Sequence, residues 1–201
     1  MKATGLWIIL VLALVAPAMA FDVYVGGSYL DYEKQFPFSS AYGVEVKGIQ
    51  PIGAGFGVGL SAGYERADLR RDVFTRGRRC VYSDITDGSY TSVPLGILGT
   101  YTIDLGKASI MAEAGLQYHL MDYDIVNNTS FVCSKFECSK QNADYNAGNI
   151  WTATPALFLN IPAGDVISIS IGGGYRWQLN AYQHDRFMEG PFGKLFLGIK
   201  I

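Results

Sequence analysis

Apolar side chains alternate with small, polar or charged ones along almost the whole of residues 21–201. Successive residues of a β-strand point to opposite faces, so a period of two predicts strands with one apolar face. In VISISIGGGYRWQL, residues 166–179, one set runs from Ile167 to two aromatic residues and the other from serine to arginine. The pattern predicts eight strands of about ten residues and no helix after residue 20, which restricts the chain to an all-β fold.

The expected connections alternate in length. Short ones are expected at 49–54, 104–107 and 160–165, and long ones at 31–40, 67–90, 122–148 and 183–191. Structureless loops of more than about 15 residues are unusual in a compact soluble domain. Short turns on one rim and long loops on the other are typical of transmembrane barrels.

The two faces differ in the side chains that they carry. Aromatic residues lie on the apolar face beside the long loops: Tyr29, Tyr42, Tyr64, Tyr118, Trp151, Tyr175 and Trp177. Charged residues lie in mid-strand on the other face: Glu45, Lys47, Glu65, Glu113, Arg176, Lys194 and Lys200. A soluble sandwich would bury its apolar face, whereas a membrane barrel turns it to lipid and places aromatic girdles at the interfaces. We therefore expect a transmembrane, eight-stranded, antiparallel up-and-down β-barrel with short periplasmic turns and long extracellular loops.

Residues 1–20 are predicted to be a signal peptide. Lys2 supplies a positive charge, residues 6–16 form a short apolar run, and Ala18–Ala20 fit the small-residue cleavage rule. A membrane anchor is the alternative. The barrel is then expected to span residues 21–201.

These features resemble the small eight-stranded outer-membrane barrels of the outer-membrane protein A and outer-membrane protein X type. The resemblance covers residues 21–201 and includes the strand GKLFLGIKI, residues 193–201. It implies a multi-pass protein of the bacterial outer membrane, inserted by the barrel-assembly machinery. It also implies roles in envelope stability, adhesion or resistance to host defence, and occasionally lipid-A enzymology.

The inward charges are expected to form a structural network. An eight-stranded barrel is only just wide enough for its own side chains, so buried Glu and Lys or Arg should pair. A conducting lumen is the alternative. Glycines at every second position of residues 53–59 are expected to leave lumen space for Tyr24, Phe158 and Phe196. No helix follows them, so a phosphate loop is not predicted.

The second long connection is rich in arginine. Six of the eight arginines of the chain lie within residues 66–79. Arginine binds phosphate and sulfate with a forked geometry. We expect an anion-binding set, with Arg66 held apart as an anchor of the girdle: Arg70, Arg71, Arg76, Arg78 and Arg79.

Cysteine and histidine give weaker indications. Cys133 and Cys138 share one long loop and are expected to form a disulfide, with Cys80 as an alternative partner for either. No metal or other cofactor is expected, because the cysteines lack close histidine partners. Neither His119 nor His184 has a recognisable nucleophile beside it, so no enzymatic activity is expected.

The sequence therefore predicts an outer-membrane barrel with a structural or surface-interaction role, in envelope integrity or adhesion. The alternatives are a small-solute porin or channel and, third, a lipid-A-modifying enzyme. Expected partners are outer-membrane lipid and lipopolysaccharide, and host surface glycans or matrix proteins. The charge balance, −2 overall, does not favour nucleic acid, and a monomer is expected.

Overall fold

The computed structural model describes residues 21–32, 38–69, 81–133, 138–141, 149–180 and 188–201, in which strands are the main regular element. The strands are β1 (Asp22–Asp31), β2 (Phe38–Gly53), β3 (Phe56–Leu69), β4 (Val81–Asp104), β5 (Ser109–Cys133), β6 (Cys138–Gln141), β7 (Ile150–Pro162), β8 (Ile167–Gln178) and β9 (Gly190–Lys200). Among these residues, no helix is long and apolar enough to cross a membrane.

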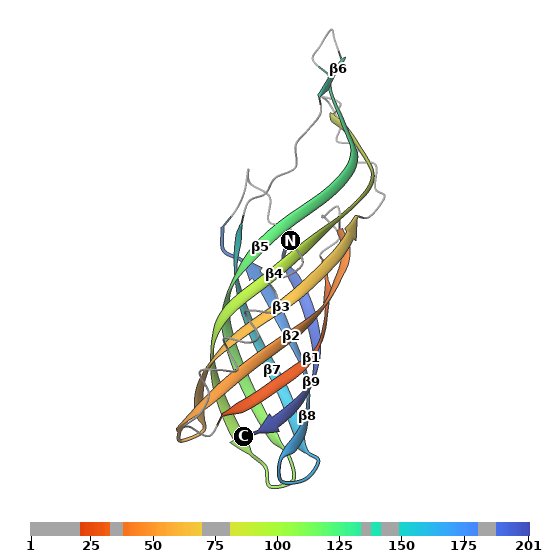
Figure 1. Cartoon of the computed structure of the whole chain (residues 1–201). Helices are drawn as coiled ribbons and strands as arrows, with labels where there is room; N and C mark the ends of the chain where they lie inside the picture. The colour runs from red at the N-terminus through yellow and green to blue at the C-terminus, as the bar shows by residue number, and fades with distance from the viewer. Residues whose placement is uncertain (1–20, 33–37, 70–80, 134–137, 142–148, 181–187) are drawn as a thin grey trace.

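Eight of the strands close into one antiparallel barrel, as predicted (Figure 1). The pairing of β1 with β9 closes the sheet. The short strand β6 pairs only with the last residues of β5 and is not part of the barrel wall. Starting from Tyr24 on β1, the register partners through β2, β3, β4, β5 and β7 end at Gln178 on β8. In the other direction, through β9, they end at Ser168 on the same strand. The strands are thus staggered by ten residues around the barrel, which requires them to tilt against its axis.

The two faces of the sheet are assigned as the sequence predicts. Along β9, Leu195 and Leu197 are about half exposed, whereas Lys194 and Phe196 are buried. The other barrel strands follow the same alternation. The apolar face is therefore the outer surface of the barrel, and the polar and charged face lines the lumen.

Glycines on the inner face make room for aromatic rings, but they are not the glycines of residues 53–59 that the sequence suggested. A Cβ atom at Gly57 or Gly59 would meet Thr100 or Leu98, not an aromatic ring. The rings instead lie over glycines on neighbouring strands: Phe196 over Gly26, Phe158 over Gly172 and Tyr24 over Gly198. That prediction was wrong because strand parity shows which side chains point inward but not which of them meet.

The turns at the end where β1 begins are short, as predicted. Gly53, Ala54 and Gly55 all have positive φ between β2 and β3. Gly106, with φ of 87°, and Gly164, with φ of 121°, serve the other two turns. Glycine adopts this left-handed backbone without steric cost, which lets the chain reverse within a few residues.

The opposite end differs from the prediction. Residues 67–90 and 122–148 were expected to be loops, but β3 runs to Leu69, β4 begins at Val81 and β5 runs to Cys133. β4 and β5 stay paired from Asp104↔Ser109 to Val81↔Val132. A two-stranded ribbon in water needs no apolar face, so its sequence lacks the alternation that identifies the other strands.

Candidate functional site

Three buried ion pairs cross the lumen, and each joins strands that are not neighbours in the sheet. The pairs are Lys47–Glu113 at 2.6 Å, Lys194–Glu45 at 2.5 Å, and Arg176–Glu65 at 2.5 and 2.9 Å. All six side chains are almost completely buried. A buried charge is tolerated when it is paired and hydrogen-bonded. Two pairs join distant strands, β2 to β5 and β3 to β8, and the third joins β2 to β9 on either side of β1.

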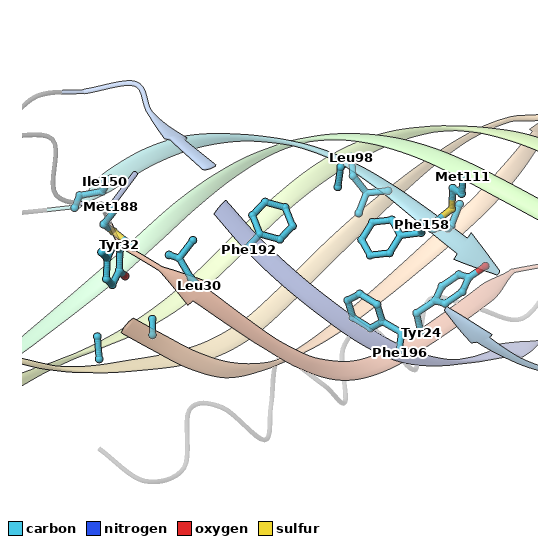
Figure 2. Packing of buried hydrophobic residues seen from close by; sticks show 14 of the residues in the cluster. Tyr24, Leu30, Tyr32, Leu98, Met111, Ile150, Phe158, Met188, Phe192 and Phe196 are labelled. Carbon is cyan, nitrogen blue, oxygen red and sulfur yellow. The ribbon is translucent and has the colours of Figure 1, made fainter. Parts of the chain in front are cut away.

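Aromatic rings surround the Lys47–Glu113 pair. The ammonium nitrogen of Lys47 lies 4.1 Å from the ring centre of Phe158, 4.3 Å from that of Phe196 and 5.3 Å from that of Tyr24. Phe196 packs edge-on against both other rings. The cation is attracted by the ring faces as well as by the carboxylate, and together these groups occupy the lumen near the short-turn end (Figure 2).

A histidine lies next to the Glu65–Arg176 pair. Nδ1 of His119 is 2.9 Å from Oγ of Ser92 and 4.0 Å from a Glu65 oxygen, and Nε2 is 3.0 Å from Oγ1 of Thr152. These residue types also build hydrolytic triads. Here His119 and Thr152 are 0% exposed and Ser92 is 1% exposed. The contacts therefore satisfy polar groups that are buried in the lumen.

Apolar side chains cap the lumen at the long-strand end. Tyr32, Tyr90, Ile150 and Met188 are all buried there, and the two tyrosine rings are 6.3 Å apart. Figure 2 shows Tyr32, Ile150 and Met188 together at one end, with Tyr24 and Met111 at the other. The amide group of Gln178 accepts a hydrogen bond from the backbone N–H of Met188. The described side chains thus pack together at this mouth of the barrel.

Known structures share this architecture. The crystal structure of the outer membrane protein OprG from Pseudomonas aeruginosa matches with a TM-score of 0.54 and 11% identity, covering 92% of this chain and 96% of OprG. The chain has the fold of an outer-membrane β-barrel protein. Neisserial surface protein A matches more loosely, with a TM-score of 0.49, 12% identity and coverage of 90% of this chain and 96% of that one. No protein-family model and no curated protein sequence matches this chain.

The barrel carries its aromatic girdle on the outer face. Among its members, Tyr118 and Trp151 lie 4.8 Å apart, ring centre to ring centre. Asn149 donates a hydrogen bond of 2.6 Å to the Tyr118 hydroxyl. Arg66 points outward in the same region, opposite Tyr42 in the register. Rings with an apolar body and a polar tip are favoured at a membrane–water interface, so this girdle marks the outer boundary of the hydrocarbon.

Several predicted residues of the outer-membrane barrel lie outside the described part of the chain. They are Arg70, Arg71, Arg76, Arg78, Arg79, Cys80 and His184. The backbones of Cys133 on β5 and Cys138 on β6 are described and face each other as register partners.

Sequence reasoning missed two groupings in the lumen. One is the ring cluster around Lys47, and the other is the contact of His119 with Ser92 and Thr152. Strand parity placed these side chains on the inner face. It gave no indication of which strands would face one another across the barrel.

Proposed function

We propose that this outer-membrane barrel has a non-enzymatic surface-interaction role. In this proposal its extracellular end contacts anionic glycolipid or glycan, and the arginine-rich segment between β3 and β4 supplies the cations. The observation that carries the proposal is the ribbon of β4 and β5, residues 81–88 and 125–132, which continues beyond the barrel (Figure 1).

The ribbon is long enough to form a contact surface outside the membrane. β4 has its last β3 partner at Ser89, yet its pairing with β5 continues to Val81. At about 3.4 Å per residue, these further eight residues reach about 27 Å past the barrel wall. β5 leaves β7 at His119 and continues to Cys133 on the same side. Such an extension adds nothing to the closure of the barrel, which supports a role in contacts.

The arginines occur where they would be presented beside this ribbon. They lie in the chain between Leu69, where β3 ends, and Val81, where β4 begins at the far end of the ribbon. A forked guanidinium binds phosphate or sulfate through two parallel hydrogen bonds. Phosphate groups of lipopolysaccharide and sulfate groups of host glycans are the proposed anions.

The lumen supports this role over that of a small-solute channel. The described side chains fill it with three ion pairs, a ring cluster and an apolar cap. An eight-stranded barrel has little room beyond its own side chains.

The test compares two charge-matched double variants on a heparin column and on vesicles that contain lipopolysaccharide. Arg78→Ala with Arg79→Ala removes two charges from the proposed site. Lys107→Ala with Lys200→Ala removes two exposed charges from the opposite end of the barrel. We expect the first variant to elute at clearly lower salt than wild type, because attraction between exposed charges is screened within about 10 Å at 0.1 M salt. The second variant should elute with wild type.

Equal elution of the two variants would contradict the proposal. In that case the arginine side chains would be either hydrated at the surface or paired with aspartates of the ribbon. Four aspartates occur in the ribbon sequence or beside it: Asp84, Asp87, Asp122 and Asp124.

A further inference from the structure

The outer face of the barrel is hollowed where β1, β9 and β8 run side by side. The hollow is shallow and open, with a volume of about 550 Å³. Gly27 and Gly193 lie in its floor, and Tyr29, Ile171 and Leu195 line its edge. These five residues belong to the outward-facing set. The other four lining residues, Ser28, Gly43, Gly172 and Lys194, have the opposite strand parity and lie beneath the outward-facing ones.

Packing within the barrel does not explain these two glycines. A Cβ atom at Gly27 would come no closer than 3.8 Å to any other residue, and one at Gly193 no closer than 4.0 Å. By contrast, a Cβ atom at the inward-facing Gly26 would collide with the carbonyl oxygen of Leu195 and the ring of Phe196. Glycine weakens a strand interior, and a larger residue would fit at both outward positions. The effect of glycine there is to leave the hollow open.

The position of the hollow restricts what fills it. Gly193 is the register partner of Tyr29, a girdle residue, so the hollow lies at the outer edge of the apolar belt. Leu195 lies two residues from Gly193 along β9, toward the middle of the membrane, and its register partner on β8 is Ile171. Both side chains are more than half exposed. The occupant must therefore be apolar at this depth and belong to the outer half of the membrane.

A cation lies on the same outer face, nearer the long-strand end because the strands tilt. Arg66 on β3 is opposite Tyr42 on β2, which is opposite Tyr29 on β1, which is opposite Gly193. Three strand spacings of about 4.8 Å place the Arg66 backbone about 14 Å from Gly193. Its side chain is 48% exposed, and its Nε contacts Asp68 at a long 3.4 Å. A guanidinium at interface depth is suited to the phosphate of a lipid headgroup.

We propose that this face binds one anionic lipid of the outer leaflet, with an acyl chain in the hollow and the headgroup phosphate at Arg66. A second copy of the chain fits less well. In a two-fold dimer the same patch faces itself, so two hollows would oppose each other and leave a void. The site is separate from the arginine-rich segment, so it stands or fails independently of the proposed surface role.

The experiment uses the refolded protein in phospholipid vesicles that contain a trace of lipid with a photoreactive diazirine on its acyl chain. One preparation carries the diazirine on phosphatidylglycerol, which is anionic, and the other on phosphatidylcholine, which is zwitterionic. After irradiation, peptide mapping locates the label. We expect wild type to show anionic label concentrated at residues 27–29, 171 and 193–195, and less zwitterionic label there.

Three variants separate the chain site from the headgroup site. Gly27→Leu with Gly193→Leu fills the hollow, and we expect label at this face to fall about threefold through the loss of several dispersion contacts. Gly99→Leu is the matched control, because Gly99 also faces outward and a Cβ atom there meets nothing within 4 Å. Arg66→Gln should remove the preference for anionic lipid, lowering the anionic label more than the zwitterionic label, because choline already neutralises the phosphate of the zwitterionic lipid. Mobility of unheated protein on SDS gels shows that each variant is folded.

Label spread evenly around the apolar belt of wild type would overturn the proposal. So would equal loss of label in Gly99→Leu and in the filled variant, or an unchanged anionic preference in Arg66→Gln. Protein–protein crosslinks that join β1, β8 and β9 of two copies would assign the hollow to a dimer instead.

Discussion

Glu65 and Arg176 form a buried pair with two parallel hydrogen bonds, from β3 to β8 across the lumen. Each member would be an isolated buried charge without the other. Removing one partner of such a pair typically costs about 3–5 kcal/mol, whereas replacing both by apolar groups is often neutral. The pair thus contributes through the penalty for breaking it more than through its net attraction.

Glu65→Gln and Arg176→Met should each lower the free energy of unfolding by about 3–5 kcal/mol, because each leaves one buried charge unpaired. The double variant should recover most of that loss. The measurement is denaturant unfolding in lipid vesicles, with the single variants as controls for the double. A double variant whose loss equals the sum of the two single losses would contradict a coupled pair.

The sequence predicted the inward direction of both residues but not their pairing. They are 111 positions apart, and nothing local relates them. Their meeting depends on the number of strands and on the stagger of ten residues, both of which are properties of the closed sheet. The same holds for Lys47 and its three rings, which come from β1, β7 and β9.

Among the elements, the strands inside the apolar belt were predictable and the ribbon was not. Lipid on one side and a packed lumen on the other impose a strict alternation, as in Lys194, Leu195, Phe196 and Leu197 of β9. Water on both sides of the ribbon imposes none. The prediction therefore stopped near Tyr90 and Asp122, although β4 and β5 continue well beyond them.

The β5–β6 hairpin should carry a disulfide between Cys133 and Cys138. These residues are direct register partners, and opposite residues of an antiparallel pair have Cα atoms about 4.5–5.5 Å apart. That spacing lies inside the range of disulfides. Peptide mapping without reduction should find the two linked and Cys80 free. A link from Cys80 to either residue, or three free thiols, would contradict the assignment.

For the whole molecule, we expect a closed barrel without steady ion conduction. The ion pairs, the ring cluster and the apolar cap occupy the described lumen at several levels. Recordings in planar bilayers should show no large, stable channel. Phe158→Ala with Phe196→Ala, which removes two rings beside Lys47, should increase brief openings. Large steady currents from wild type would favour the channel alternative.

The pairing of β1 with β9 also has a consequence for how the barrel inserts into the membrane. These strands stand at opposite ends of the described chain, and Phe21 and Ile201 exchange two backbone hydrogen bonds of 3.1 Å at the seam. Until β9 arrives, β1 and β8 each have an edge whose N–H and C=O groups find no partner in hydrocarbon. An open edge of this sheet therefore needs another strand as partner in hydrocarbon. We expect substitutions that disrupt β9 to lower the yield of assembled barrel more than they destabilise a barrel that is already closed.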